Sequence, residues 1–173
     1  MADAGAIAAI YNDAVATSTA TFDLEPETVA TRELWLAAES TLLCLVAELE
    51  GRVVAWSALL RWSERHGYDH AAEAAIYVAA GCRRSGVGRA LVTAALAAAP
   101  GLDLHAVIAQ ICSENTPGLA LATGLGFAPV GTLHEVGLKF GRRLDVTICE
   151  RLIQAAAPQR HRNTRGPAIM LPE

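Results

Sequence analysis

The chain has 173 residues, a formal net charge of −4 at pH 7 and a hydrophobic fraction of 53%. This length is typical of one domain that buries a core of its own. Charge or glycine interrupts the longest apolar runs, which excludes a membrane-spanning helix of about 18 residues or more. The negative charge disfavours a nucleic-acid partner, because such partners favour a basic face. We therefore expect a soluble protein.

The two ends of the sequence differ in character. The chain opens with MAD and passes directly into a helical pattern, without the basic start and cleavable apolar run of a secretory signal. We therefore expect a cytoplasmic location. After Ala155 the composition shifts to proline, arginine, asparagine and glycine, and the basic stretch 160–165 is typical of a solvated tail. The sequence predicts one domain over residues 1–154 and a flexible tail over 155–173.

Apolar periodicity and turn residues divide the domain into helices and strands. In chain order we predict helices 4–16 and 27–39, strands 44–48 and 52–60, a loop 61–70, strand 73–78, helix 86–99, strand 105–111, helix 115–123, and strands 130–140 and 143–152. Strands on both sides of helix 86–99 imply one parallel crossover, whereas hairpins elsewhere imply antiparallel pairing. The predicted fold is α/β (α+β), with a mixed, mostly antiparallel sheet.

The stretch from Ile76 to Val92 is predicted to form a strand, a basic turn and an amphipathic helix. Gly86 and Gly88 let backbone N–H groups approach a ligand, and the helix start adds unpaired donors and a positive dipole end. This turn is suited to phosphate or pyrophosphate. A Walker loop would need Lys and then Ser or Thr after Gly86, and a dinucleotide fingerprint would need Gly at Leu91. An ordinary turn with a glycine cap remains the alternative.

The pattern Arg83-x-x-Gly86-x-Gly88 after a strand resembles the acyl-CoA pyrophosphate loop of the GCN5-related N-acetyltransferases. Further motifs in the same order make the chain similar to the phosphinothricin and methionine-sulfone N-acetyltransferase group of that superfamily. They are IYNDAV at 10–15, TATFD at 19–23, EAAIYV at 73–78, SEN at 113–115, GLGF at 124–127 and VGLKFG at 136–141. The resemblance covers roughly residues 4 to 152.

This resemblance implies a fold and a reaction. The fold has a central splay in the sheet and flanking helices, and its first edge strand, which relatives place before the first helix, is expected to be missing here. The reaction transfers the acetyl group of acetyl-CoA, as co-substrate, to the amine of a small amino-acid-like molecule by direct attack in a ternary complex. Acceptors of the phosphinothricin, methionine sulfone and sulfoximine type imply antimetabolite detoxification. We also expect a homodimer, and no metal.

The resemblance also implies where acetyl-CoA binds. The splayed end of the strand leaves backbone groups of Ile76, Tyr77 and Val78 free to pair with the pantetheine arm, and the Val78 N–H would stabilise the oxyanion. The pyrophosphate loop is expected to comprise Arg83, Arg84, Ser85, Gly86, Val87, Gly88 and Arg89, with the amides from Arg84 onward holding the pyrophosphate. Asn115 would hydrogen-bond the arm, and a role as helix N-cap is equally compatible with it.

The acceptor amine arrives protonated, so the site needs a base. Glu73 is the predicted base, because it is the one carboxylate in an alanine-rich run and matches the family's catalytic glutamate. A solvent-facing charge or a partner for Arg65 is the alternative reading of Glu73. The predicted acceptor pocket has an aromatic wall and a cationic end. Its residues are Phe22, Arg61, Arg65 and Tyr68, together with Glu73 and Ala75.

One position departs from the family pattern. Relatives carry Tyr or His four residues before the glycine of the Gly-Phe pair, where this chain has Ala122. The usual general acid is therefore missing, although a thiol with a pKa near 8.5 leaves tolerably well without help. Tyr77 and His134 are candidate substitutes, although a buried structural role is the favoured interpretation of both. A catalytically weak acyl-CoA-binding module stays open as an alternative function, and so does a protein or peptide N-acetyltransferase, which the loop 61–70 disfavours by covering the site.

Overall fold

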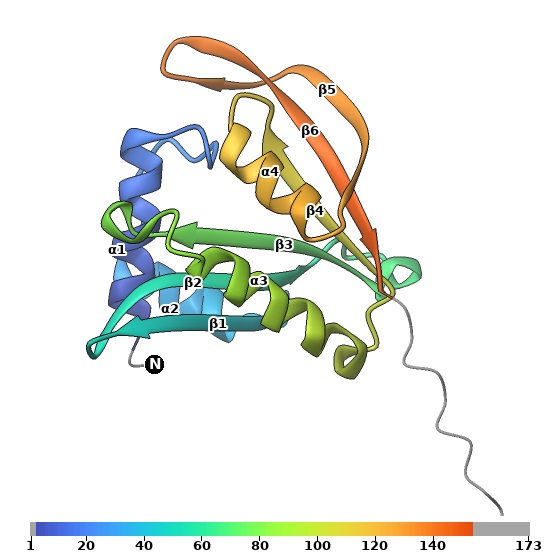
Figure 1. Cartoon of the computed structure of the whole chain (residues 1–173), viewed down its shortest axis with the longest axis horizontal. Coiled ribbons are helices and arrows are strands. Elements are labelled where there is room, and N and C mark those ends of the chain that lie inside the picture. Colours follow the sequence, from blue (N-terminus) through green and yellow to red (C-terminus); the bar gives the residue numbers. More distant parts are fainter. Residues whose placement is uncertain (1–2, 154–173) are drawn as a thin grey trace, which may run out of the picture.

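The structure is a computed structural model that describes residues 3–153, so the predicted tail 155–173 lies outside the described residues (Figure 1). The helices are α1 (Ala4–Thr17), α2 (Val29–Ala37), α3 (Val87–Ala98) and α4 (Thr116–Gly124). The strands are β1 (Thr41–Leu49), β2 (Arg52–Arg61), β3 (Ala71–Val78), β4 (Ala106–Cys112), β5 (Ala128–Lys139) and β6 (Arg142–Leu152). In the described part of the chain, no helix is long and apolar enough to cross a membrane.

The six strands form one sheet in the order β1-β2-β3-β4-β6-β5. Only β3 and β4 pair in parallel, and α3 makes the crossover between them, whereas every other neighbouring pair is antiparallel. The predicted mixed, mostly antiparallel sheet is therefore confirmed. Within residues 3–153 the first element is α1, and no strand precedes it.

Helices cover both faces of the sheet, because side chains alternate along each strand. On one face Trp56 of β2 packs with apolar residues of α1 and α2. On the other face Leu59 of β2 packs with apolar residues of α3, α4 and β4. Trp56 and Leu59 are both almost completely buried. Strand β3 lies between the two cores, so alternate β3 residues face the α1–α2 layer and the α3–α4 layer.

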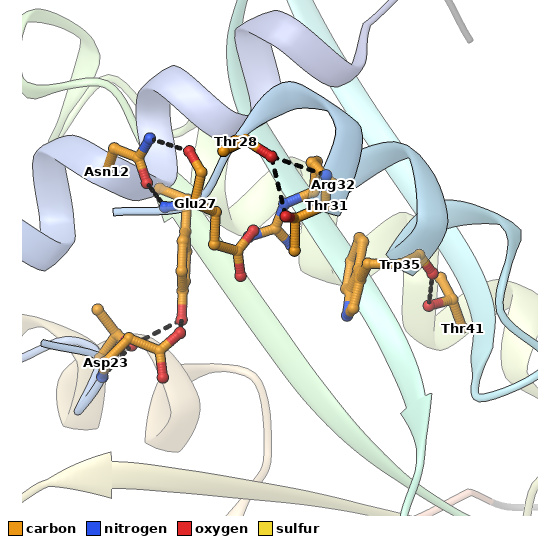
Figure 2. Close-up of polar contacts among 10 residues, drawn as sticks. Asn12, Asp23, Glu27, Thr28, Thr31, Arg32, Trp35 and Thr41 are labelled. Carbon is orange, nitrogen blue, oxygen red and sulfur yellow. Dashed lines mark hydrogen bonds and ion pairs between the residues drawn. The ribbon is translucent and has the colours of Figure 1, made fainter. Parts of the chain in front are cut away.

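Helix α2 begins two residues later than the sequence predicts. Glu27 was the expected start, but its backbone forms a reciprocal pair with the side chain of Asn12 in α1 (Figure 2). The Glu27 N–H donates to Asn12 Oδ1, and Asn12 Nδ2 donates to the Glu27 carbonyl, each at 2.8 Å. Thr28 then caps the helix by accepting from the Thr31 N–H. A side chain of α1 thus sets the start of α2.

A buried cation joins α1, α2 and the sheet. Arg32 of α2 is 2% exposed, and its guanidinium lies 4.4 to 5.2 Å from the ring centroids of Tyr11, Trp35 and Trp56. Its charge is balanced by Glu27, 2.5 Å away. Aromatic faces attract a cation, and a buried charge needs a partner of opposite sign. This cage fixes the α1–α2 layer against the sheet.

Candidate active site

The sheet divides between its two parallel strands. β3 and β4 pair only from Ala71 with Ala106 to Glu73 with Ile108. Beyond Glu73, β3 stays paired with β2 and β4 stays paired with β6, so the two parallel strands diverge (Figure 1). The splay that the resemblance implies is therefore present, and it begins at Glu73.

The register of β3 determines which backbone groups face this splay. The Ala79 N–H donates to the Val54 carbonyl of β2 at 2.9 Å. Because the groups of an antiparallel strand point alternately to either side, the backbone groups of Ala74, Ile76 and Val78 point toward β4. No described strand pairs with those of Ile76 and Val78 there, since the β3–β4 ladder ends at the pair of Glu73 with Ile108. The splay thus exposes a short edge on which an extended molecule can form strand-like hydrogen bonds.

A cavity of about 130 Å³ occupies the splay. Residues from β3, β4, α3, α4 and the α1–α2 connection line it: Ala20, Glu73, Ala74, Ala75, Ile76, Tyr77, Val92, Ala109, Gln110, Ile111, Asn115, Gly118, Leu121, Ala122, Leu125 and Phe127. Most are apolar and many are small. The structure therefore brings together five of the predicted site residues, namely Glu73, Ala75, Ile76, Tyr77 and Asn115.

Glu73 is half-buried at the point where the splay begins. Burial raises the pKa of its carboxyl above the ordinary value, and a hydrogen bond from Gln110 opposes this shift without cancelling it. Gln110 Nε2 donates to Glu73 Oε1 at 3.2 Å from the neighbouring strand. The partner of Glu73 is thus Gln110, not Arg65. Sequence reasoning missed Gln110, although it is the one amide in the apolar strand AVIAQIC.

The turn before α3 has the conformation of an anion-binding loop. Arg84 and Gly86 both have positive φ angles, of 63° and 88°, so the backbone curves and turns its N–H groups toward one side. The first helical hydrogen bond runs from the Ala90 N–H to the Gly86 carbonyl. The N–H groups of Val87, Gly88 and Arg89 therefore have no acceptor within the helix. They remain free for a ligand.

The two glycines of this turn have different functions. Gly86 supplies the left-handed conformation, and a Cβ there would meet nothing within 4 Å. Gly88 faces β3 more closely: a Cβ there would lie in ordinary van der Waals contact with it, 3.4 Å from Val78 Cγ2 and 3.8 Å from Ile76 Cγ1. The start of α3 therefore packs against the end of β3.

The side chains of the turn bind the protein itself. Arg83 Nε donates to the Val78 carbonyl at 3.2 Å, and Arg83 Nη2 lies 3.4 Å from an Asp13 carboxylate oxygen. Ser85 Oγ donates to the Cys82 carbonyl at 2.7 Å, and Arg89 Nη1 donates to the carbonyl of Gly124 in α4 at 2.8 Å. These contacts hold the turn against α1, β3 and α4. The turn therefore offers a ligand mainly its backbone amides.

Asn115 is the N-cap of α4. Its Oδ1 accepts a hydrogen bond from the Gly118 N–H at 3.1 Å. Asn115 also lines the cavity, so the capping role and contact with a bound molecule are compatible. Gly118 must stay small, because a Cβ there would lie 2.7 Å from Asn115 Nδ2.

The predicted acceptor residues separate into two groups. Phe22 lies in the α1–α2 connection, two residues from the cavity-lining Ala20, and its ring packs on Gly137 of β5. Arg61, Arg65 and Tyr68 lie at or beyond the end of β2 and do not line the cavity. Arg61 instead forms a 2.6 Å ion pair with Asp69 of its own loop. The predicted cationic end is therefore not part of this cavity, because the loop neutralises its own charge.

The structure also shows where the two candidate substitutes for the missing general acid, Tyr77 and His134, lie. Tyr77 OH donates to the Ala20 carbonyl at 3.2 Å, its ring stacks on Trp56, and burial raises its pKa to about 12. His134 is exposed, so the buried structural role favoured from the sequence is wrong for it; it pairs with Asp145 on the β5–β6 hairpin at 3.0 Å and does not line the cavity. Ala122 is buried in the cavity wall. Glu73 and Tyr77 are the titratable side chains among the lining residues.

A sheet that divides between two parallel strands, with an anion-binding turn at the following helix, defines an acyl-CoA-dependent N-acyltransferase. The Acetyltransferase (GNAT) family matches residues 7–127, and the chain belongs to this family. The protein is accordingly an acetyl-CoA-dependent N-acetyltransferase.

Relatives with assigned activities match nearly the whole chain. An L-methionine sulfoximine/L-methionine sulfone acetyltransferase of Pseudomonas paraeruginosa is 33% identical over 153 residues, or 87% of this chain and 89% of that protein. A phosphinothricin N-acetyltransferase of Streptomyces viridochromogenes is 32% identical over 163 residues, or 92% of this chain and 87% of that protein.

Solved structures agree in fold. A phosphinothricin acetyltransferase of Sinorhizobium meliloti, in complex with acetyl-CoA, has a TM-score of 0.85 at 27% identity, covering 92% of this chain and 90% of that one. A structure named as a ribosomal-protein-alanine N-acetyltransferase of Brucella melitensis has a TM-score of 0.83 at 34% identity, covering 87% and 94%.

Proposed function

We propose that this enzyme acetylates the amine of small amino-acid-like molecules of the phosphinothricin, methionine sulfone and methionine sulfoximine type. The proposal rests on the position and environment of Glu73. It is a half-buried carboxyl with a raised pKa, at the start of a cavity beside unpaired backbone amides. A molecule that only bound acyl-CoA would have no need of a carboxylate there. The names of the relatives support the same acceptor class.

Acetyl-CoA is proposed to lie along the unpaired edge of β3. The pyrophosphate is assigned to the amides from Arg84 to Arg89, where the positive φ angles and the helix start favour an anion. The pantetheine arm is assigned to the backbone of Ile76 and Val78 and to Asn115, which lines the cavity. The backbone groups of Tyr77, which the sequence also led us to expect on the arm, point toward β2 instead. The thioester then lies in the splay, within reach of an acceptor that approaches Glu73.

Glu73 starts the reaction by taking one proton from the acceptor's ammonium group. The lone pair left on nitrogen attacks the thioester carbon, and the carbonyl electrons move to oxygen as the new C–N bond forms. When the carbonyl re-forms, the C–S bond breaks and the CoA thiolate leaves. The thiolate takes the second proton from nitrogen, and Glu73 passes its own proton to solvent. The products are the N-acetylated acceptor and CoA.

The oxyanion needs a backbone donor that faces the splay, and both Ile76 and Val78 offer one. At about 3.3 Å per residue, their positions lie roughly 10 Å and 16 Å along the strand from Glu73. The nearer Ile76 N–H suits direct proton abstraction by Glu73. The Val78 N–H, which the sequence analysis assigned to the oxyanion, suits a base that acts through ordered water. One such donor contributes on the order of 10² to 10³ in kcat.

We further propose a cytoplasmic homodimer with a small-molecule partner and no nucleic-acid partner. β5 is an edge strand and exposes Val130, Leu133, Val136 and Leu138 by 47 to 62%. An exposed apolar edge strand of this kind is usually covered by another molecule. We propose that a second copy of this chain covers it. Sedimentation at micromolar concentration tests it. Leu138→Lys should yield monomers, whereas Leu34→Lys on α2, where Leu34 is 74% exposed, should not.

The deciding experiment follows thiol release from acetyl-CoA with a panel of acceptors. Phosphinothricin, methionine sulfone, methionine sulfoximine and the common amino acids represent the proposed class. A peptide with N-terminal alanine represents the second candidate, which the name of the Brucella structure favours. We expect kcat/KM to be highest for one of the small amino-acid analogues. Preference for the peptide would transfer the assignment to protein acetylation, and no release with any acceptor would favour the binding-module alternative.

A further inference from the structure

Residues 18–28, which connect α1 to α2, form the wall of the cavity on the acceptor side. Ala20 lines the cavity together with Glu73 and Tyr77. Three consecutive residues of this connection are each held by a different side chain or strand. Tyr77 OH donates to the Ala20 carbonyl, Lys139 Nζ donates to the Thr21 carbonyl, and the Phe22 ring packs on Gly137. Two of these three supports lie at the end of β5.

Lys139 is an unusual residue for its strand. Most of β5 is exposed, yet Lys139 is 2% exposed. Its ammonium donates to the Thr21 carbonyl at 2.7 Å and lies 5.3 Å from the centre of the Phe140 ring. Burial lowers the pKa of this ammonium, and the charge of Asp23 opposes that shift. A buried ammonium is unfavourable unless hydrogen bonds or an opposite charge compensate for the lost water. The placement of this ammonium against residues 21–23 therefore indicates that it has a function there.

The ring of Phe22 packs directly against the backbone of Gly137. A Cβ built on Gly137 would lie 2.0 Å from Phe22 Cε1 and 2.5 Å from Cδ1. Real side chains never approach so closely, so any larger residue would displace the ring. The φ angle of Gly137 is not positive, which means that space and not backbone conformation requires the glycine.

Helix α1 holds the same segment from the other side. Tyr11 OH lies 2.8 Å from Thr21 Oγ1 and donates to Asp23 Oδ2 at 2.6 Å. Asp23 also donates its backbone N–H to Thr21 Oγ1 (Figure 2). The connection is therefore fixed between α1 and the end of β5, with Ala20 directed at the cavity.

We propose that Lys139 is a positioning residue of the acceptor site, which together with Gly137 holds residues 20–22 at the distance from Glu73 that the acceptor requires. The inference rests on the proposed function, because it takes the Ala20 side of the cavity as the acceptor side. Neither residue touches the unpaired edge of β3, so acetyl-CoA should bind without them. Their effect should be confined to the acceptor.

The test compares two substitutions with a matched control. Lys139→Met keeps the length and burial of the side chain but removes the hydrogen-bond donor. Gly137→Ala keeps Lys139 but pushes the Phe22 ring away. Gly131→Ala is the control in the same strand, because a Cβ there meets nothing within 4 Å. Lys139→Arg restores a donor and should recover part of the lost activity.

A wall displaced by about 1 Å costs up to the order of 10²-fold in rate. We therefore expect Lys139→Met and Gly137→Ala each to lower kcat/KM for the acceptor by about 10- to 100-fold. Acetyl-CoA affinity, measured by calorimetry, should change less than about twofold in both. In the double variant, the combined fold-change in acceptor kinetics should be smaller than the product of the two single fold-changes, because both substitutions act on one segment. Gly131→Ala should resemble the parent.

Amide hydrogen exchange of residues 19–24 gives a second measurement that needs no acceptor. Exchange should be faster in Lys139→Met and Gly137→Ala and unchanged in Gly131→Ala. An unchanged kcat/KM for the acceptor in either folded variant would overturn the proposal, as would an equal loss of acetyl-CoA affinity. If Lys139→Met does not fold, the acceptor kinetics and amide exchange of Gly137→Ala and Lys139→Arg test the proposal in its place. A parent protein that acetylates no acceptor would refute the proposed function, whereas the exchange result would still stand.

Discussion

Replacing Glu73 by Gln is the most direct test of the proposed chemistry. Gln has almost the same shape as Glu and keeps an oxygen that can accept the 3.2 Å hydrogen bond from Gln110. The side chain should therefore stay in place at the start of the splay, while its basicity is lost. General base catalysis contributes about 10²- to 10⁴-fold, so kcat at neutral pH should fall by that factor. This corresponds to roughly 3 to 5.5 kcal/mol of activation free energy.

The pH dependence separates a base from a merely structural carboxyl. Raising the pH supplies more acceptor that is already deprotonated, so activity of Glu73→Gln should recover toward pH 9. Acetyl-CoA affinity should hold, because the amides of the loop and of β3 are unchanged. The assay is thiol release from pH 6 to 9 with saturating acetyl-CoA. Glu48→Gln is the control, because Glu48 is an exposed carboxylate on β1. A mutant as active as the parent across this range would refute the reasoning.

The same substitution should change stability in a defined direction. Burial raises the pKa of Glu73 in the folded protein above the ordinary 4.5. The favourable, protonated form is therefore present below pH 4.5, and its stabilisation is lost as the pH rises through the folded-state pKa. Glu73→Gln avoids this loss. Its Tm should exceed that of the parent at pH 8, and the difference should shrink toward pH 4.5. A difference that grows on acidification would contradict the assignment of burial as the cause.

Three further predictions concern residues outside the base. Gly86→Val forces a left-handed backbone on a β-branched residue, and Gly88→Val adds two methyl groups beyond a Cβ position that is already in contact with Val78. The thermal shift produced by acetyl-CoA should therefore vanish in both, and retention in both would refute the loop assignment. Ala122→Tyr should not raise kcat by more than about tenfold, because a thiolate leaves without help; a larger gain would mean that the missing acid limits the rate. Arg32→Ala leaves Glu27 unpaired and empties the aromatic cage, so urea unfolding should show a loss of about 3 kcal/mol, and a loss below 1 would contradict the cage's role.

The sequence predicted the parts of the fold that depend on local pattern. Periodicity located every α-helix and strand of the described residues to within a few residues, because alternation and the 3.6-residue repeat are properties of short segments. Asn115 was foreseen as an N-cap, since its position before Thr116 and Pro117 is a local signal. The start of α2 was misplaced because Asn12, fifteen residues away, holds the Glu27 backbone.

Contacts between distant segments explain what the sequence did not predict at the site. The bond from Lys139 to Thr21 joins residues 118 positions apart, and no local pattern announces it. Arg61 was expected in the acceptor pocket because cations suit acidic acceptors, but Asp69 in the same loop pairs with it. Charge and residue type thus predict what a side chain is able to bind, whereas the tertiary structure decides which partner it meets.

The splay between β3 and β4 gives the sheet four edges in place of two. An ordinary edge strand is a template on which another chain can pair, and proteins protect such edges against aggregation. Here the two inner edges face each other across a cavity of about 130 Å³ that α3 and α4 close on one side. A thin, extended arm without side chains fits such a gap, whereas another polypeptide strand would have to place side chains against Leu121 and Phe127. In the proposed arrangement, the unpaired edge receives the co-substrate and is shielded from other proteins.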